Sequence, residues 1–498
     1  MNRIFSIGSI LAAVFLACGC AVGPNYAPPV TQTPAAWTID QEGGITAQPL
    51  EVVTWWELLS DSMLNSLIQR AVEANYDLRI AQARVREARA QRAVVAGGRW
   101  PEVDAFGSYT RSRRSENSFG GGGEFGPQGQ DVDLFQTGFD AAWELDVFGR
   151  VRRSVEAADA EFGAAIEDRR DVLVTLLAEV ARNYVETRDA QRRLEIANNN
   201  IESQRETLQI SEARYNAGLV SELDVAQARA QLATTRSQVP VLETALRQSM
   251  YALAVLLARE PGALIDELAA PGPIPSSPAQ VPVGLPSDLL RRRPDIRAAE
   301  RQLAAATARI GVATADLFPR FLLTGSISLA AEDAALLFNG SSLAYSFGPS
   351  VSWPVFAGGS IRANIQVQNA VQEQALAQYE RTVLLSLADV ENSLVAFWKQ
   401  QSRREALTEA VAANRRAVEL ANELYSRGVG DFLNVLESQR SLYLVEDQLA
   451  QSERDVTSAY IALYKALGGG WQVFEAQPQP TTAPEGAPAD EVASAAQH

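Results

Sequence analysis

The chain has very little histidine, cysteine or lysine. Its single histidine is the last residue, His498, and its two cysteines, Cys18 and Cys20, lie within the first twenty residues. Ser-His and Cys-His catalysis need these side chains, and so do zinc sites built from His or Cys. The sequence also has no GxxxxGK[ST] phosphate loop. The many carboxylates lie among arginines, as on a solvated helix face. We therefore expect no enzyme, no metal site and no bound cofactor.

Basic charge is also scarce. Lys399 and Lys465 are the only lysines, and 44 Lys and Arg stand against 60 Asp and Glu, which gives a net charge of −16. A nucleic-acid surface would need a basic stripe, and none is found. We expect no nucleic-acid partner.

The first residues have the layout of a secretory leader. They contain Arg3, an apolar run over residues 4–16, and small residues ahead of Cys20. The run is shorter than a membrane-spanning helix needs. A cysteine at the end of such a leader resembles a bacterial lipoprotein signal, which predicts lipidation of Cys20. Cys18 is a weaker competitor, and a plain signal peptide with incidental cysteines is the alternative.

Two stretches show a seven-residue recurrence. Residues 359–467 form two limbs around a turn at residues 427–431, and an earlier stretch does the same around residues 217–221. This recurrence keeps one seam facing a partner helix, as in coiled coils. At 1.5 Å per residue, a limb of about 70 residues reaches about 100 Å. The seam positions are Leu173, Val180, Thr187, Leu194, Ile201, Leu208 and Tyr215 in the earlier stretch, and Val383, Val390, Phe397, Arg404, Val411, Val418, Tyr425, Leu442, Leu449, Val456 and Leu463 in the later one.

The two halves of the chain are copies of each other. Subtracting 210 takes Tyr425 to Tyr215, and a shift of 218 relates the helical segments at residues 64–95 and 285–318. A shared shift over dozens of positions predicts an internal duplication.

Two single residues predict local features of the helices. Asp61 precedes the first helical segment and fits an N-cap. Pro240 lies inside a coiled-coil limb, opposite Ala450 in the other half, and predicts a bend or a local break.

Each half also contains stretches that alternate between apolar and polar residues. Residues 321–329, 345–353 and 135–145 alternate clearly, and residues 103–109 match less well because Phe106 lies on the polar face. Each half therefore offers two strands of about ten residues, the length of a tilted transmembrane β-strand.

Four strands are too few to close a membrane barrel. Known barrels begin at about eight strands, and lipid leaves no sheet edge unpaired. The leader favours a barrel, so we expect an oligomer with about twelve strands in a trimer or about eight in a dimer. The alternative is a small four-stranded sheet in the periplasm.

Four short motifs follow one another along the chain. They are CAVGPNY at residues 20–26, WELDVFGR at residues 143–150, LRRRPDI at residues 290–296 and YKALGGGW at residues 464–471. Together they resemble the TolC-like outer-membrane factors, specifically the NodT-type lipoprotein branch that serves RND-type efflux systems. The resemblance extends from the leader to about Trp471.

The resemblance implies a fold that is mainly α with a membrane β-barrel. Long antiparallel coiled-coil hairpins would form a periplasmic α-barrel, and four strands per protomer would contribute to a trimeric twelve-stranded β-barrel. The implied segments are a lipoprotein signal peptide at residues 1–19, an extended N-terminal segment at residues 20–60, a first structural repeat at residues 61–260, an equatorial linker at residues 261–285, a second repeat at residues 286–470, and a disordered tail at residues 471–498.

The resemblance also implies the function. The chain would be the passive outer-membrane duct of a tripartite efflux pump, lipid-anchored in a Gram-negative outer membrane and extending into the periplasm. Its partners would be two further copies of itself, a periplasmic adaptor, an inner-membrane RND pump and outer-membrane lipid. Two alternatives stay open: a duct for type I protein secretion, and a lipid-anchored periplasmic scaffold without a channel.

Two groups of site residues follow from the resemblance. A periplasmic gate would use Leu433, Asn434, Glu437 and Arg440, although family members often have Asp where Glu437 stands. The alternative is that Leu433 packs in the seam while Glu437 and Arg440 form an exposed pair. The adaptor would dock on the two turns, formed by Gly218, Leu219, Val220 and Ser221 and by Gly428, Val429, Gly430 and Asp431.

Overall fold

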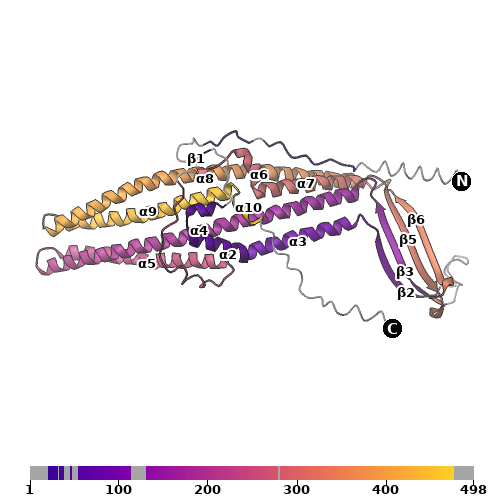
Figure 1. Cartoon of the computed structure of the whole chain (residues 1–498), viewed down its shortest axis with the longest axis horizontal. Coiled ribbons are helices and arrows are strands. Elements are labelled where there is room, and N and C mark those ends of the chain that lie inside the picture. The colour runs from indigo at the N-terminus through magenta and orange to yellow at the C-terminus, as the bar shows by residue number, and fades with distance from the viewer. Residues whose placement is uncertain are drawn as a thin grey trace. The chain divides into compact units, whose positions relative to one another are not determined.

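The computed structural model describes residues 21–31, 33–38, 45–46, 54–113, 131–278 and 281–475 (Figure 1). Cys18 and the predicted lipidation site Cys20 lie outside the described residues. So do residues 476–498, the greater part of the predicted tail.

The long helices of the two halves have matching bounds. α4 (Arg150–Asn216) and α8 (Ser360–Ser426) have 67 residues each, and α5 (Glu222–Leu256) and α9 (Phe432–Ala466) have 35 each. The numbers of their first residues differ by 210, from 150 to 360 and from 222 to 432. α3 (Tyr76–Gly97) and α7 (Pro294–Ala315) have 22 residues each, with bounds that differ by 218. The predicted duplication is confirmed.

The first α-helix of the described residues, α2 (Ser62–Ala74), begins at the predicted N-cap. Asp61 is its N-cap, and the Asp61 Oδ1 atom accepts a hydrogen bond of 3.0 Å from the backbone N–H of Leu64. Tyr184 donates a second bond, of 2.8 Å, to Asp61 Oδ2. The cap is therefore also tied to α4.

Of the bend or local break predicted at Pro240, the break is wrong, because α5 continues through this residue without interruption. The bend stays a prediction. A proline inside a helix removes one backbone hydrogen bond and costs about 3 kcal/mol. Buried side chains on both sides, among them Thr235 and Leu242, hold the helix against its neighbours. Packing thus outweighs the local preference.

No helix among the described residues is both long enough and apolar enough to cross a membrane.

Four antiparallel strands form one sheet in the order β2-β3-β5-β6 (Figure 1). The strands are β2 (Glu102–Arg113), β3 (Asp131–Leu145), β5 (Arg320–Ala331) and β6 (Leu343–Ser352). The central pair joins the two halves of the chain, with Phe139 opposite Ile327 and Gly138 opposite Ser328. A Cβ atom on Gly138 would lie 2.3 Å from the Ile327 backbone oxygen, so this register needs glycine.

The four strands predicted from the alternation are confirmed. Phe139, Ile327, Tyr345 and Phe347 are exposed large apolar side chains in the single chain. Within the described residues, the outer strands β2 and β6 each pair with one neighbour only. The sheet therefore has two open edges and exposed apolar side chains.

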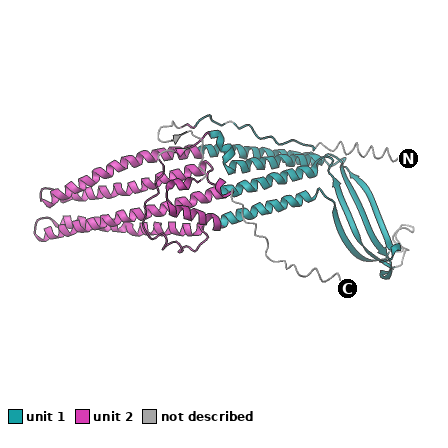
Figure 2. Ribbon diagram, viewed as in Figure 1, with its two compact units in different colours: residues 1–36, 76–172, 286–388 teal, residues 37–75, 173–285, 389–498 magenta. Residues whose placement is uncertain are grey.

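The chain divides into two compact units (Figure 2). Unit 1 holds residues 1–36, 76–172 and 286–388, and therefore the four-stranded sheet, α3 and α7. Unit 2 holds residues 37–75, 173–285 and 389–498, and therefore α2, α5 and α9. The remaining short elements are β1 (Ile45–Thr46), β4 (Val281–Pro282), α6 (Leu289–Arg292), α10 (Gln472–Glu475) and the 3-10 helices Trp55–Leu59, Pro286–Asp288, Ala334–Leu336 and Gly340–Ser342.

An aromatic cluster lies in the core of unit 2. The Trp55 ring stacks on Tyr464 at 5.8 Å between ring centres, and Tyr460 donates a hydrogen bond of 3.1 Å to the Trp55 backbone oxygen. Gly470 has a φ of +103°, and a Cβ atom there would lie 2.8 Å from Leu177 Cδ1. The YKALGGGW motif is therefore part of the core of this unit.

Candidate functional site at the two helical turns

The two turns between the long helices have the same backbone geometry. Gly218 and Gly428 have φ angles of +73° and +74°. The N–H of Gly218 bonds to Tyr215 O at 2.9 Å, and the next N–H bonds to Arg214 O at 2.9 Å. This pair of bonds is the Schellman motif that ends many helices, and it recurs at Gly428, whose N–H bonds to Tyr425 O at 3.0 Å. Glycine is favoured at both positions because φ is positive.

The turns present short side chains and exposed apolar groups. Leu219 and Val429, which follow the two glycines, are both exposed. Ser221 and Asp431 are the N-cap residues of α5 and α9, but neither side chain caps its helix. Val220 and Gly430, the other two turn residues, are half-buried.

The second turn is packed more tightly than the first. Tyr425 is 5% exposed and contacts the ring of Phe432, whereas its equivalent Tyr215 is 44% exposed. Arg214 accounts for part of this difference, because its guanidinium carbon lies 4.4 Å from the centre of the Tyr425 ring. Arg214 is not among the site residues predicted from the sequence. The signal was available, since the duplication places Leu424 at the equivalent position.

The predicted gate residues share one exposed face of α9. Leu433 is 56% exposed and Asn434 is exposed too, while Val435 and Gln439 on the other side of the helix are buried. Leu433 therefore does not pack in the seam of its own chain. Glu437 and Arg440 are exposed and their charged atoms lie 3.9 Å apart. Such an exposed pair contributes at most about 1 kcal/mol.

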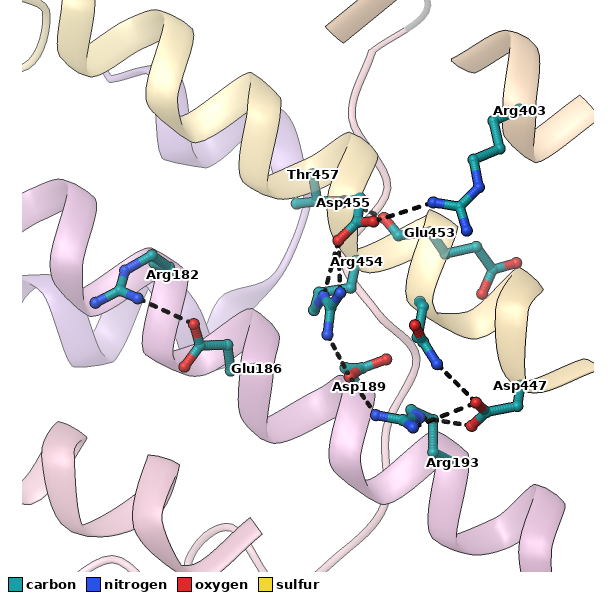
Figure 3. A network of polar contacts seen from close by, with 11 residues as sticks. Arg182, Glu186, Asp189, Arg193, Arg403, Asp447, Glu453, Arg454, Asp455 and Thr457 are labelled. Atoms are coloured by element: carbon teal, nitrogen blue, oxygen red, sulfur yellow. Dashed lines mark hydrogen bonds and ion pairs between the residues drawn. The ribbon is translucent and has the colours of Figure 1, made fainter. Parts of the chain in front are cut away.

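Hydrogen bonds and ion pairs join the first hairpin to α9 (Figure 3). Near the turns, Gln439 donates a bond of 2.9 Å to Thr207 of α4. Further along, Arg193 Nε lies 2.6 Å from Asp447 Oδ1, and Arg454 Nη1 lies 3.3 Å from Asp189 Oδ2.

Asp189 is the most buried acid of this ion-pair cluster, which comprises Asp189, Arg193, Asp447, Arg454 and Asp455. Its Oδ1 atom has no hydrogen-bond partner among the described residues. Burial raises the pKa of Asp189 to about 6, although Arg454 and Arg193 oppose the shift. Asp455, another acid of the cluster, also pairs with Arg403 of α8 at 3.6 Å. The cluster thus holds a carboxylate that binds a proton more readily than a solvated one.

Comparison with known proteins identifies the family. The model of the family described as "Outer membrane efflux protein" matches residues 67–259 and 285–469. The chain belongs to this outer membrane efflux protein family. Nodulation protein T of Rhizobium leguminosarum bv. trifolii is 33% identical over 457 residues, which are 92% of this chain and 96% of that protein. Solvent efflux pump outer membrane protein SrpC of Pseudomonas putida is 34% identical over 93% of this chain and 98% of its own length.

Solved structures of the family have the same fold. The outer-membrane channel OprN is 39% identical, with a TM-score of 0.85 over 91% of this chain and all of its own. The channel CusC is 29% identical, with a TM-score of 0.77 over 91% of this chain. The predicted family and fold class are therefore confirmed. As an outer membrane efflux protein, the chain is an efflux duct of the Gram-negative outer membrane that extends into the periplasm, as predicted.

Proposed function

We propose that this outer membrane efflux protein is the passive third component of a tripartite RND-type pump. An inner-membrane RND pump would supply the energy, and a periplasmic adaptor would connect the two. The family match over both halves of the chain carries this proposal, together with relatives named as efflux pump outer membrane proteins. The duct itself would then catalyse no reaction and hold no metal or cofactor.

The working form in this proposal is a homotrimer with a twelve-stranded barrel in lipid. The open edges of β2 and β6 support it, because unpaired backbone groups are costly in a membrane. The exposed apolar side chains of β6, including Tyr345 and Phe347, would face lipid. A lipid on Cys20 would anchor each copy.

The two turns would dock the adaptor. Their glycines leave room for a partner, since no atom lies within 4 Å of a Cβ built on Gly218. The exposed Leu219 and Val429 offer apolar contact area. Both turns have the same Schellman geometry, so the adaptor would meet the same backbone arrangement twice.

The exposed face of α9 would close the duct between uses. Three copies of Leu433 would form an apolar ring that excludes water, flanked by Asn434, Glu437 and Arg440. The exposure of these four side chains in the single chain supports the proposal, because a residue packed inside one chain cannot line a ring between chains.

In the trimer, the segments would have separate roles. A signal peptide at residues 1–19 would be removed, residues 20–60 and the linker at residues 261–285 would form an equatorial region, and residues 61–260 and 286–470 would be the two repeats. The tail predicted at residues 471–498 would begin after α10, because Trp471 is buried and residues 472–475 are helical.

Two measurements test the function. The first is the native mass of the protein extracted from outer membranes in detergent, followed by its conductance in planar bilayers. A conducting trimer with acyl mass on Cys20 is expected, whereas a water-soluble monomer without conductance would indicate the periplasmic scaffold.

The second measurement is the phenotype of a deletion strain. Sensitivity to small toxic compounds is expected, and a defect confined to protein export would overturn the RND assignment in favour of type I secretion.

A further inference from the structure

The first described residues of the chain, from Ala21 onward, pack against α4 and α7 within unit 1. The backbone N–H of Val22 donates a hydrogen bond of 3.1 Å to Phe148 O, in the turn between β3 and α4. The next residue of that turn, Gly149, has a φ of +83°, and a Cβ atom on it would lie 2.6 Å from the Cβ of Ala21. The β3-α4 turn is thus shaped to let the N-terminal segment pass at close range.

A second contact is made by two glycines. Gly23 has a φ of +88°, and a Cβ atom on it would lie 2.5 Å from the Cα of Gly311 in α7. Contacts of that length are not found between real side chains and backbone, so the segment touches the helix only because Gly23 lacks a side chain. A Cβ atom on Gly311 would lie 2.8 Å from the Arg153 side chain, so this glycine leaves room for the arginine.

The third contact is a buried arginine. Arg153, near the start of α4, is 3% exposed and directs its guanidinium at the segment. Its Nε atom donates to Val22 O at 3.2 Å, and its Nη2 atom donates to Gly23 O at 3.3 Å and to Asn25 Oδ1 at 2.7 Å. On the other side, Nη1 pairs with Glu156 at 2.7 Å. A buried guanidinium must satisfy its donors, and most of the acceptors here come from the N-terminal segment.

We propose that Arg153, Gly149 and Gly311 form a receptor for the segment directly after Cys20, and that this receptor fixes the lipid anchor beside the β3-α4 turn. The inference rests on the proposed lipidation. Consecutive Cα atoms are about 3.8 Å apart, so a lipid on the residue before Ala21 is tethered within one residue of the docked backbone. A lipid on Cys18 would instead be separated from the docked backbone by two further residues.

The receptor also accounts for two of the motifs that the duct function alone leaves unexplained. The CAVGPNY segment supplies Val22, Gly23 and Asn25 as the docked residues, and the WELDVFGR segment supplies Phe148 and Gly149 as the turn. Further along the segment, Tyr26 donates a bond of 3.0 Å to Glu300 Oε1 and Thr31 bonds to Tyr379 at 3.0 Å, so the docking continues past the receptor.

The position of the lipid can be measured with a photoreactive fatty acid incorporated in cells. Irradiation of isolated outer membranes, followed by peptide mass analysis, should crosslink the lipid on Cys20 mainly to peptides around Val147 and Phe148. Three variants should spread these crosslinks: Arg153→Met, Gly311→Ala, and a four-residue Gly-Ser insertion between Cys20 and Ala21. The insertion leaves every docking residue in place, so it tests the tether even if Arg153→Met fails to fold.

Matched controls keep the docking and change other features. Gly163→Ala adds a Cβ to α4 instead of α7, at a position where only the flexible Arg301 side chain lies within 3.5 Å. The same insertion placed after Thr31 lengthens the chain without changing the tether. Both should keep the wild-type crosslinks.

Protease cleavage gives a second readout. If Arg153→Met and Gly311→Ala release the segment, cleavage within residues 21–31 should rise by at least about tenfold, which corresponds to about 1.4 kcal/mol.

The possible failures are distinguishable. An absence of fatty acid on Cys20 in the wild-type protein would overturn the proposed lipidation, and the anchor inference with it. Normal lipidation with the same crosslinks in all three variants would overturn the receptor alone and leave the duct function untouched.

Discussion

Arg214 Nη1 donates a hydrogen bond of 2.6 Å to the backbone oxygen of Tyr425 and stacks over its ring, so the end of α4 supports the end of α8. The last carbonyls of a helix have no intrahelical donor. Tyr425 O accepts from the Gly428 N–H of its own turn, and Arg214 adds a second donor from the other hairpin. The two turns of unit 2 are therefore mechanically linked within one chain.

Replacing Arg214 should loosen the second turn. Arg214→Met keeps the length of the side chain but removes the charged donor, which is worth about 1.5–3 kcal/mol when it bonds a buried acceptor. We expect cleavage near Gly428 by a protease to rise by about tenfold or more. Arg229→Met is the control, because Arg229 forms an exposed pair with Glu212. Equal cleavage in both variants would contradict the link.

Filling either turn should block adaptor docking without blocking assembly. Gly218→Trp and Gly428→Trp have room for a side chain, since the nearest atom to either Cβ is 3.9 Å away, but positive φ costs about 1–2 kcal/mol. We expect normal trimers and lost resistance to toxic compounds. Gly358→Trp carries the same strain at a φ of +59°, with nothing within 4 Å and far from the turns in sequence, and should retain resistance. Normal resistance in the turn variants would exclude docking there.

Shortening the proposed gate side chain should make the closed duct leak. Leu433→Ser removes an exposed side chain, so stability should change by no more than about 0.5 kcal/mol. Single-channel recordings should show a higher closed-state conductance, because a polar ring admits water. Leu444→Ser, at another exposed leucine of α9, is the matched control. If both variants conduct like wild type, Leu433 is not at the gate.

Asp189 should make the protein more stable at mildly acidic pH. Its pKa in the folded protein is about 6, above its ordinary value of 3.8, so the folded state binds the proton more tightly. The resulting stabilisation is complete below about pH 4 and is lost as the pH rises through about 6. Between pH 7.5 and pH 5 it amounts to about 1 kcal/mol.

Thermal unfolding against pH should detect this contribution. In Asp189→Asn, which cannot ionise, the gain in melting temperature between pH 7.5 and pH 5 should be smaller than in wild type. Glu419→Gln, at an exposed acid of α8, should follow the wild-type curve. Parallel curves for wild type and Asp189→Asn would rule out Asp189 as the source.

Adding one methyl group at Gly470 should destabilise unit 2. A Cβ in Gly470→Ala would meet Leu177 at 2.8 Å and Trp56 at 3.0 Å, at a φ that disfavours side chains. Overpacking of this kind costs about 1–3 kcal/mol. Gly469→Ala is the control, since its Cβ would make ordinary contacts at 3.6 Å and 3.7 Å. Similar melting temperatures for the two variants would show that the core adapts.

The sequence by itself determined the elements and their repetition. Helix ends follow from local signals such as Asp61 and the turn glycines Gly218 and Gly428, and strands follow from alternation, which depends only on near neighbours. The shift of 210 residues that relates Tyr215 to Tyr425 also relates the ends of α4 to those of α8, so the two helices are equal in length. Pro240 did not break its helix, because packing of α5 outweighed the lost hydrogen bond.

Only the tertiary structure decided which residues act together. Arg153 with Gly23, Asp189 with Arg454, and Arg214 with Tyr425 are separated by 130, 265 and 211 residues. Neither the seven-residue recurrence nor the shifts of 210 and 218 residues pair these positions. Their roles come from burial and from the groups that long-range packing places around them. The proton affinity of Asp189 is the clearest case, because one buried oxygen without a donor changes the chemistry of a carboxylate that the sequence shows as one acid among 60.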